Sequence, residues 1–472
     1  MRRAKIVSTL GPAVNSKEDI RRLIDAGIDV ARINRSHGSY DEHEQQIKWV
    51  HEGAAESGRA VAVLVDLQGP KIRTGRFSGG PVHLAVGDVF TITVDDVDGD
   101  RDRVSTTFKG LPGDVRVGDT LLIDDGKISL RATEITDTDV TCTVIEGGTV
   151  SNNKGINLPG VAVSVPALSE KDEEDLRWAL RVGADWIALS FVRDAADITR
   201  VHEIMAEVGL VRPVIAKIEK PQAVANLPEI VAAFDGIMVA RGDLGVEMPL
   251  EEVPLVQKRA VELARRDAKP VIVATQVLES MIENSRPTRA EASDCANAVL
   301  DGADAIMLSG ETSVGAWPVV AVRTMARIIE NTEDHGLGRI PPLGTNPSTT
   351  GGAITKSAAE IGEFLNAKYL VTFTTSGDSA RRMSRVRPKL PMLAFTQKPH
   401  TRRRLALTWG ITAFLIPELE DTVSMVGAVD RMLLEQGRCT HGDTIVVVAG
   451  RPHGVAGTTN ALQVHRVGGL AE

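Results

Sequence analysis

Cysteine is scarce in this sequence. The 472 residues contain three, Cys142, Cys295 and Cys439, and these form neither a CxxC motif nor an even-numbered framework. A disulfide-stapled fold is therefore excluded. We expect a protein of the reducing cytoplasm.

Long apolar runs and concentrated positive charge are lacking as well. No run approaches the roughly 20 residues that a membrane-spanning helix needs. The opening segment MRRAKIVSTLGP enters a strand pattern without the apolar core of a signal peptide. The formal net charge is -9, and the basic residues are scattered along the chain. We expect neither a membrane nor a nucleic acid as partner, so a local site must hold any anionic substrate.

The sequence does contain a regular alternation of short β-branched runs with amphipathic stretches, which is typical of βα units. Eight such runs precede residue 310, the number of strands in a closed (β/α)8 TIM barrel. The runs are 6–9, 30–34, 62–66, 186–190, 214–218, 236–240, 271–275 and 305–309. Helix patterns lie between most of them, such as the one that starts after Ser16 and stops at Gly27.

Two segments depart from the βα alternation. Alternating runs with turn signals between residues 70 and 166 predict a small β-barrel domain inserted into a barrel loop. The Pro- and Gly-rich segment GRIPPLGTNPSTTGG predicts a linker, after which strand and helix patterns resume as in an open α/β sheet. The predicted organisation is a barrel of residues 1–69 and 167–337, an insertion of 70–166, a linker of 338–352 and a C-terminal domain of 353–472.

Polar residues follow many of the predicted barrel strands. Active sites of such barrels form at the C-terminal ends of the strands. The strand ends carry Arg32, Asn34, Ser36, Asp66, Lys217, Glu219, Arg241, Asp243, Thr275, Ser309 and Glu311. Any one of them alone would be an ordinary cap or turn residue, but their convergence on one rim predicts a functional site.

The acidic pair Glu219 and Asp243 has the chemistry of a metal site. Two carboxylates from neighbouring strands can bind a hard divalent cation such as Mg2+ and leave positions open for substrate oxygens. Lys217 faces the same lumen as Glu219, where it either pairs with that carboxylate or, if unpaired, attracts an anion. Gly242 and Gly245 indicate a plain turn, or a turn into a short helix whose N–H groups hold a carboxylate.

These residues predict a divalent-metal barrel enzyme that acts on a small carboxylated or phosphorylated anion. They do not identify which reaction it catalyses. Neither a GxGxxG nor a Walker A pattern is present in MVARGDLGVEMP (238–249).

At the same residues the chain closely resembles the pyruvate kinases over essentially its whole length. The matching segments include DVARINRSHG (29–38), DLQGPKIRTG (66–75), KGINLPG (154–160), VIAKIEKPQAV (214–224), IMVARGDLGVEMP (237–249) and IMLSGET (306–312). The resemblance implies transfer of a phosphoryl group from phosphoenolpyruvate to ADP with two Mg2+ ions, one arriving with the nucleotide. It also implies a cytoplasmic homotetramer.

Roles follow from the resemblance position by position. Glu219 and Asp243 correspond to Mg2+ ligands, and Lys217 to the group that stabilises the phosphoryl group in flight. Arg32 corresponds to a phosphate contact of phosphoenolpyruvate. The remaining substrate contacts are Gly242, Asp243, Thr275 and Ser309, and the nucleotide side comprises Asn34, His37, Arg73 and Lys154. Because Lys154 and Arg73 belong to or border the insertion, that domain is expected to act as a lid that excludes water.

A departure from the family concerns K+. Many members hold this ion through positions that here are Asn34, Ser36, Asp66 and the backbone of Leu67. Where those members have Thr and Lys after the aspartate and Glu after the proline, this chain has Leu67, Gln68 and Lys71. We expect the Lys71 ammonium to supply the charge of K+, as in similar K+-independent bacterial members. A solvent-facing lysine of no consequence is the alternative.

The C-terminal segment TFTTSGDSA (372–380) resembles the phosphate-cradling loop of the family's allosteric site. Its phosphate contacts would be Thr374, Thr375, Ser376, Gly377 and Ser379. A simple strand-to-helix turn is the alternative. The loop lacks the lysine of some fructose-bisphosphate-responsive members, so a sugar or nucleotide monophosphate is also a candidate effector.

Two other functions share part of the pattern. A Mg2+-dependent lyase or aldolase would also need a carboxylate pair, but it predicts neither a nucleotide lid nor a large C-terminal domain. A non-catalytic regulator that binds phosphometabolites would be expected to have lost Lys217 or a metal carboxylate, and the sequence retains them.

Overall fold

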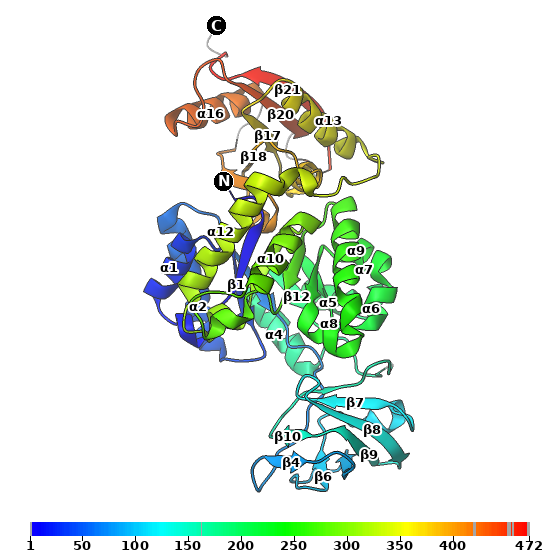
Figure 1. Ribbon diagram of the computed structural model, residues 1–472. Coiled ribbons are helices and arrows are strands. Elements are labelled where there is room, and N and C mark those ends of the chain that lie inside the picture. The colour runs from blue at the N-terminus through cyan, green and yellow to red at the C-terminus, as the bar shows by residue number, and fades with distance from the viewer. Residues whose placement is uncertain (1, 162, 419–421, 451–454, 456, 470–472) are drawn as a thin grey trace.

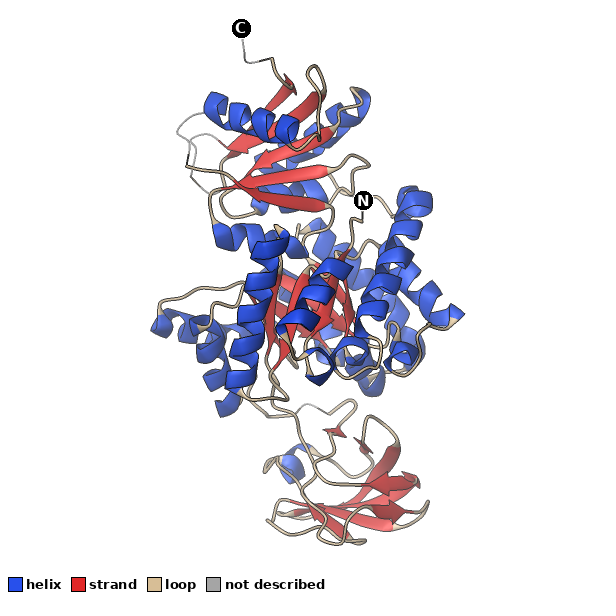
Figure 2. Ribbon diagram, turned by 90° about the vertical axis from the view of Figure 1, so that its left-hand side faces the viewer, coloured by secondary structure: helices blue, strands red, loops and turns tan. Residues whose placement is uncertain are grey.

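The computed structural model describes residues 2–161, 163–418, 422–450, 455 and 457–469. They form three bodies in a row (Figures 1 and 2). A barrel lies in the middle, a β domain at one end and an α/β domain at the other. No helix in the described ranges is long and apolar enough to cross a bilayer.

The central body is the predicted barrel. In the described part of the chain, eight parallel strands close in the order β1-β16-β15-β14-β13-β12-β3-β2. Their bounds are β1 Lys5–Thr9, β2 Val30–Asn34, β3 Ala62–Asp66, β12 Trp186–Leu189, β13 Val214–Ile218, β14 Gly236–Ala240, β15 Val271–Ala274 and β16 Ala305–Leu308. Each agrees with a predicted run to within one residue at either end, because β-branched runs between turn residues are unambiguous signals.

Helices cover the outside of the barrel (Figure 2). They are α1 Lys17–Ala26, α2 Tyr40–Ser57, α4 Glu170–Arg181, α5 Thr199–Val208, α6 Pro221–Ala225, α7 Leu227–Ala233, α8 Arg241–Glu247, α9 Val253–Arg266, α10 Arg289–Asp301, α11 Gly310–Ser313 and α12 Pro318–Gly336. Helix α1 begins where predicted, with the Ser16 side chain accepting a hydrogen bond from the Asp19 N–H, and it ends at Gly27 in the left-handed conformation.

An aspartate stands just before every second barrel strand and ties it to its neighbour. Each carboxylate accepts a hydrogen bond from a backbone N–H at the start of the preceding strand in the chain. The pairs are Asp29 with Ile6 (2.9 Å), Asp185 with Val63 (3.0 Å), Asp235 with Val214 (2.9 Å) and Asp304 with Val271 (3.2 Å). The described barrel is therefore built from strand pairs that share one anchoring device at their N-terminal ends.

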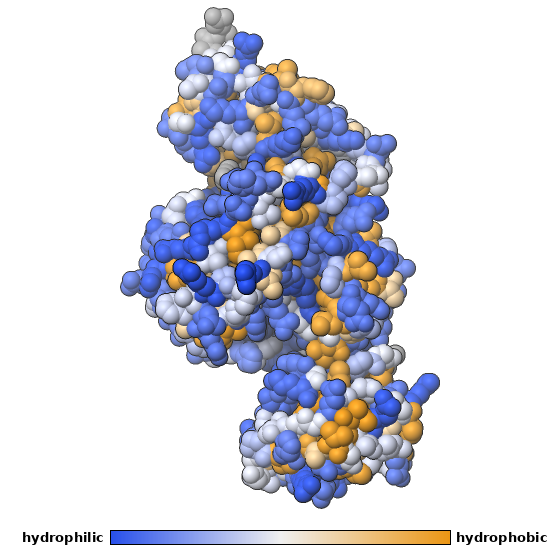
Figure 3. Space-filling view, viewed as in Figure 1, coloured by the Kyte–Doolittle hydropathy of each residue, from blue (hydrophilic) through white to orange (hydrophobic). Residues whose placement is uncertain are grey.

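The inserted strands fold around a core of their own, which includes Phe90, Leu121 and Leu130. Among the described residues they form a six-stranded sheet, β11-β7-β8-β9-β5-β6, and a two-stranded sheet, β10-β4, where we predicted a small barrel. Their bounds are β4 Val82–Leu84, β5 Val89–Thr93, β6 Arg103–Ser105, α3 Leu111–Asp114, β7 Thr120–Ile123, β8 Ile128–Ile135, β9 Asp139–Glu146, β10 Gly148–Val150 and β11 Ile156–Asn157. On the face shown in Figure 3 this domain joins the barrel by a narrow neck.

The C-terminal domain is an open sheet with helices on both faces (Figure 2). Its described strands run in the order β19-β18-β17-β20-β21, and only β21 is antiparallel to its neighbour. The bounds are α13 Thr350–Phe364, β17 Tyr369–Phe373, α14 Asp378–Ser384, β18 Met392–Thr396, α15 Pro399–Arg404, β19 Ile411–Leu415, α16 Thr422–Glu435, β20 Thr444–Gly450 and β21 Thr459–Arg466. Helix α13 begins within the segment predicted as linker, because Thr349 caps it.

The two ends of the barrel face different domains. The N-terminal end of β1 lies toward the C-terminal domain, and the opposite end of the barrel faces the inserted domain (Figure 1). Ala406 and Leu407, in a short 3-10 helix after α15, pack against lumen residues such as Val7 and Ala62. The C-terminal strand ends, where the site was predicted, thus point toward the inserted domain.

Candidate active site

A compact group of charged side chains fills the C-terminal end of the barrel lumen. Arg32, from β2, places Nη2 2.7 Å and Nε 2.8 Å from Asp66 Oδ2 at the end of β3. Lys217, from β13, places Nζ 3.4 Å from Asp66 Oδ1 and 2.7 Å from Glu219 Oε1. The two carboxylates are almost entirely buried, so the cations supply their main compensation. Lys217 therefore pairs with Glu219, the first of the two arrangements that the sequence left open.

The charge states follow from these contacts. Burial acts to raise the pKa of Asp66, but Lys217 and Arg32 outweigh it and lower the pKa. Burial acts to lower the pKa of Lys217, and the opposing attraction of Asp66 and Glu219 raises it above its usual value. The rim therefore holds a permanent ammonium beside a permanent carboxylate.

Glu219 and Asp243 fit a divalent cation. Burial raises the pKa of Glu219, and repulsion from Asp243 adds to this effect despite the nearby Lys217. Glu219 Oε1 pairs with Lys217 Nζ (2.7 Å), while Oε2 accepts a hydrogen bond from the Phe191 N–H (2.8 Å). A cation between these two carboxylates would relieve the repulsion.

The protein offers few other ligands for such a cation. No group of three or more His, Cys, Asp or Glu side chains arranged for a metal occurs in the described ranges. Two carboxylates leave most coordination positions of an octahedral ion to water and substrate oxygens, which is the usual manner of Mg2+ binding at phosphoryl-transfer sites.

The loop after β15 completes this side of the rim. Thr275 has a φ of 67° and Gln276 a φ of 54°, a left-handed conformation that β-branched residues avoid. The turn aims the Thr275 hydroxyl at the start of α8, where it accepts a hydrogen bond from the Gly242 N–H (2.7 Å). This N–H, which the sequence offered as a carboxylate contact, is thus already engaged. Ser309 Oγ is buried without a hydrogen-bond partner in the described chain.

Comparison with known proteins identifies the family. The family model for the pyruvate kinase barrel domain matches residues 1–322, and that for the pyruvate kinase alpha/beta domain matches residues 352–465. The chain belongs to the pyruvate kinase family. Its activity is accordingly that of a phosphotransferase.

Individual relatives match over the full length. A pyruvate kinase of Mycobacterium intracellulare is 60% identical over 467 residues, which cover 99% of both chains. One from Mycobacterium tuberculosis is 58% identical, again over 99% of both. A crystal structure of a pyruvate kinase from Cryptosporidium parvum superposes with a TM-score of 0.91 at 36% identity, covering 99% of this chain and 96% of that one. The barrel, the insertion and the C-terminal domain therefore occur together in that solved pyruvate kinase as well.

Two of the predicted nucleotide residues lie away from the barrel rim of this pyruvate kinase. Lys154 Nζ binds Asp124 Oδ1 (2.9 Å), and Arg73 Nη1 donates to the Asn153 carbonyl (3.0 Å). Both side chains therefore contact the inserted domain, and no contact links them to the barrel rim in the described residues. His37 is exposed at the end of the β2 loop.

The predicted monovalent-cation residues are partly brought together. Asn34 Oδ1 accepts a hydrogen bond from the Ser36 N–H (3.1 Å), and the Leu67 carbonyl accepts one from Ser190 Oγ (2.8 Å). No ion pair joins Lys71 to Asp66 among the described residues. The Lys71 side chain lies against Gly155 of the inserted domain, where an added Cβ would stand 3.5 Å from Nζ. The cations that face Asp66 are instead Arg32 and Lys217.

Two residues of the site escaped sequence analysis. Ser190 Oγ lies 2.8 Å from Lys217 Nζ, and Thr9 Oγ1 accepts a hydrogen bond from Arg32 Nη1 (3.0 Å). Both hydroxyls stand at the ends of barrel strands. The signal was therefore present, but serine and threonine are too common at strand ends to single out.

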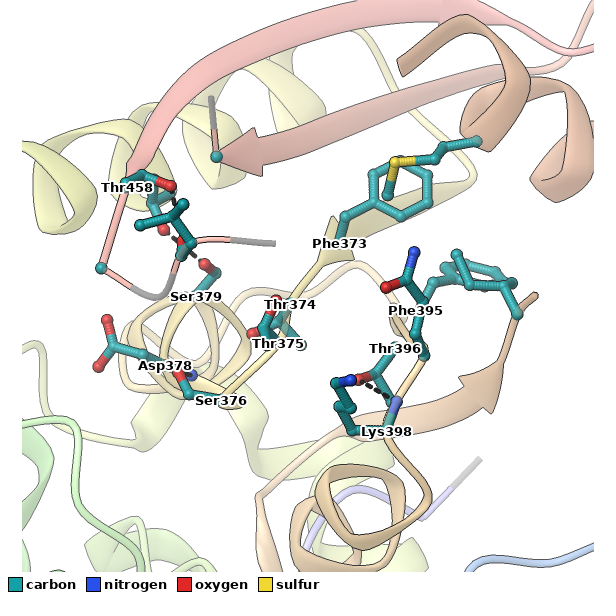
Figure 4. Close-up of a pocket in the computed structure, with 17 residues that line it drawn as sticks. Phe373, Thr374, Thr375, Ser376, Asp378, Ser379, Phe395, Thr396, Lys398 and Thr458 are labelled. Atoms are coloured by element: carbon teal, nitrogen blue, oxygen red, sulfur yellow. Dashed lines mark hydrogen bonds between the residues drawn. The ribbon is translucent and has the colours of Figure 1, made fainter. Parts of the chain in front are cut away.

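The predicted effector loop lines a separate pocket in the C-terminal domain (Figure 4). Thr374, Thr375 and Ser376 lie between β17 and α14. Thr374 Oγ1 accepts a hydrogen bond from the Gly377 N–H (2.9 Å), which shapes the loop. Lys398, at the end of the neighbouring β18 loop, also lines the pocket. The basic residue that the loop itself lacks therefore comes from another segment.

Proposed function

We propose that this chain transfers the phosphoryl group of phosphoenolpyruvate to ADP, giving pyruvate and ATP. The observation that carries the proposal is the buried cluster of Arg32, Asp66, Lys217 and Glu219 at the strand ends. An ammonium and a guanidinium held in one lumen suit a substrate that carries a phosphate and a carboxylate.

Each side chain has a role in this proposal. Glu219 and Asp243 would hold Mg2+, which supplies Lewis-acid charge to substrate oxygens when bound. Arg32, fixed by Asp66 and Thr9, presents its guanidinium to the substrate phosphate. Lys217 stabilises charge on the phosphoryl group as it moves. Buried and already oriented, these donors need little reorganisation during the reaction.

The left-handed turn at Thr275 positions the other end of the substrate. It fixes the first turn of α8, which carries Asp243 within electrostatic reach of Lys217 and Glu219. Ser309 Oγ, buried and without a partner in the described residues, is available for a substrate oxygen. The backbone N–H groups of Gly242 and Asp243, the former after its release from Thr275, would bind the carboxylate of phosphoenolpyruvate together with Ser309 Oγ.

The inserted domain acts as the lid in this proposal, and the predicted domain boundaries are part of it. Arg73 and Lys154 would leave Asn153 and Asp124 and reach the nucleotide phosphates when the narrow neck bends. Asn34 and His37 would meet the nucleotide from the barrel side. Closure would exclude water, which otherwise competes with ADP for the phosphoryl group.

A coupled assay tests the reaction directly. Pyruvate formed from phosphoenolpyruvate, ADP and Mg2+ is followed through lactate dehydrogenase and NADH. We expect turnover that requires ADP and Mg2+. Pyruvate release without ADP would favour a phosphatase, and substrate binding without turnover would favour a regulator.

We propose further that added K+ is not required. Asp66, central to the expected K+ site, has Oδ2 on Arg32 and Oδ1 near Lys217, and Asn34 Oδ1 is engaged by Ser36. Two of the expected oxygen ligands are thus satisfied by the chain itself. Activity in buffers free of both Na+ and K+ that rises less than about twofold with K+ would support this; collapse without K+ would refute it.

A phosphorylated metabolite is the proposed effector of the C-terminal pocket. The hydroxyls of Thr375 and Ser376 with the Lys398 ammonium offer donors for one phosphate group. Rates at subsaturating phosphoenolpyruvate are compared with a sugar monophosphate, a nucleoside monophosphate and fructose bisphosphate. Lys398→Met should abolish any response while leaving the basal rate unchanged. A homotetramer, also proposed, is tested by light scattering of the eluted protein.

A further inference from the structure

The junction between the inserted domain and the barrel contains a buried carboxylate that has no role in the steps described so far. Glu247, the last residue of α8, is 3% exposed. Its Oε1 atom accepts a hydrogen bond from Asn157 Nδ2 (2.8 Å) and lies 2.6 Å from Lys220 Nζ. Asn157 belongs to β11 of the inserted domain, whereas Lys220 follows β13 of the barrel. Glu247 therefore connects the inserted domain to two segments of the barrel.

Both of these barrel segments carry a carboxylate that is proposed to hold Mg2+. Asp243 lies four residues before Glu247 on α8, so the two side chains share one face of that helix. Lys220 directly follows Glu219 in the chain. Lys220 Nζ also lies 5.5 Å from the centre of the Phe191 ring, and the Phe191 N–H donates to Glu219 Oε2 (2.8 Å). A displacement of Glu247 would therefore move the supports of both carboxylates.

On the side of the inserted domain, β11 lies close to a proposed nucleotide contact. Lys154 stands three residues before Asn157, and its Nζ atom binds Asp124 Oδ1 (2.9 Å). Asp124 follows β7, the strand that pairs with β11. The turn after β7 also approaches α8, since a Cβ added at Gly126 would stand 3.9 Å from Val246 Cγ1. The position of β11 relative to α8 therefore sets how far the Lys154 ammonium lies from the metal carboxylates.

The Asn157–Glu247 contact differs in kind from the other contact at this junction. A buried carboxylate is unfavourable unless it is paired and hydrogen-bonded, and Glu247 has both an ammonium and an amide on one oxygen. A charge-assisted hydrogen bond of this kind is directional, so it fixes the two segments in one register. Arg193 Nη1 instead donates to the carbonyl of Val163 (2.9 Å), a contact that involves neither α8 nor β11.

We propose that Glu247 is a positioning residue for phosphoryl transfer, which anchors the inserted domain at β11 and aligns the nucleotide phosphates with the metal carboxylates. This inference rests on the proposed function, because it requires that Lys154 meets the nucleotide and that Glu219 and Asp243 hold Mg2+. Glu247 itself contacts neither substrate nor metal. It acts through Asn157 on the inserted domain and through Lys220 and α8 on the barrel.

Calorimetry of Mg2+·ADP binding tests this alignment without turnover. Asn157→Ala removes the contact on the side of the inserted domain and should weaken Mg2+·ADP binding about tenfold or more, because Lys154 is no longer held at its distance from the metal. Binding of phosphoenolpyruvate with Mg2+ should change less than about twofold, since its proposed contacts lie on the barrel rim. In the coupled assay the KM for ADP should rise, while the KM for phosphoenolpyruvate should not.

A double-mutant cycle tests whether Asn157 and Glu247 act as one contact. Glu247→Ala should weaken Mg2+·ADP binding at least as much as Asn157→Ala does, and the double variant should weaken it no further than Glu247→Ala. Glu247→Gln retains an oxygen that accepts a hydrogen bond from Asn157, so it should recover most of the binding. If Glu247→Ala folds poorly, the comparison of Asn157→Ala with Glu247→Gln still tests the contact.

Two control variants separate this contact from general effects. Glu134→Gln removes an exposed carboxylate of the inserted domain and should change Mg2+·ADP affinity less than about twofold. Arg193→Met removes the other contact at the junction and should weaken Mg2+·ADP binding much less than Asn157→Ala does. Equal weakening in Arg193→Met would overturn the inference, because a loosened junction would then explain both results.

The proposed reaction and the role of Glu247 can fail separately. Absence of turnover in the wild-type chain would refute the reaction, while calorimetry would still report whether Asn157 and Glu247 govern nucleotide binding. Unchanged Mg2+·ADP binding in Asn157→Ala, or additive losses in the double variant, would overturn the inference. Equal weakening of phosphoenolpyruvate and ADP binding would also overturn it, since that result indicates a general loss of structure.

Discussion

Lys217 offers the sharpest test of the proposed catalysis. Its Nζ atom lies 2.7 Å from Glu219 and 3.4 Å from Asp66, and it is the ammonium of the described rim. A phosphoryl oxygen that replaces one of these contacts would lie at a similar distance. At about 4 Å and an effective dielectric constant of about 20, one unit charge is worth about 4 kcal/mol. The corresponding change in rate is about 10³-fold.

Lys217→Met should therefore lower kcat about 10³-fold in the coupled assay and change the KM for phosphoenolpyruvate much less, because Arg32 still holds the phosphate. The same substitution should increase Mg2+ affinity, since the ammonium beside Glu219 Oε1 no longer competes with the metal. Titration calorimetry with Mg2+ measures this second effect. Opposite changes in turnover and metal affinity distinguish lost catalysis from lost structure.

Two controls bracket the Lys217 result. Lys48→Met removes an exposed lysine of α2 and should leave both quantities unchanged. Lys217→Arg retains the charge with a different shape and should recover only part of the rate. A fall in kcat of less than about tenfold in Lys217→Met would refute the reasoning, because the ammonium would then contribute too little to the transition state.

Three further outcomes follow from the geometry. Burial and Arg35 lower the pKa of His43 to about 4, below the usual 6.5. The unfolded chain therefore binds this proton at a higher pH than the folded chain does, so the free energy of unfolding should fall as the pH drops from 6.5 to 4. The urea midpoint should fall less over this range in His43→Gln, which has no titrating group at this position. Arg387→Met removes the ion-pair partner of buried Asp304 (3.1 Å) and should lower the free energy of unfolding by about 3–5 kcal/mol, because the carboxylate stays buried without it. Thermal unfolding should show a lower Tm, and an unchanged Tm would contradict this expectation. Thr275→Ala should lower kcat/KM by about tenfold or more, since the start of α8 loses its hydroxyl anchor, and an unaltered kcat/KM would exclude that role.

The sequence was most informative about the barrel. All eight predicted runs became strands because they are buried on both faces and therefore continuously apolar. The convergence of Arg32, Asp66, Lys217 and Glu219 could also be predicted, since parallel strands end on the same rim. In the C-terminal domain, β19 and β21 are harder to predict, because exposed residues interrupt their apolar pattern.

The remaining features depend on contacts between distant segments. The position of Lys71 against Gly155 depends on how the insertion sits, which no local pattern records. Lys398 joins the Thr374–Ser379 loop across adjacent parallel strands. The anchoring aspartates occur in the similar tripeptides GID, GAD, AFD and GAD. Such short matches carry little information by themselves, because only the structure shows that each carboxylate accepts a hydrogen bond from a backbone N–H of the adjacent strand.

The tie between Asp185 and Val63 differs from the others in the length of chain that it closes. It spans 122 residues, whereas the ties at Asp29, Asp235 and Asp304 span 23, 21 and 33. The whole insertion lies inside this strand pair, so its loop-closure entropy is the largest of the set. Arg403 Nε, in the C-terminal domain, donates a hydrogen bond to Oδ1 of the same aspartate, Asp185 (2.9 Å). The strand pair β3–β12, which closes the longest loop, is thus held together by an ion pair from the part of the chain that is synthesised last.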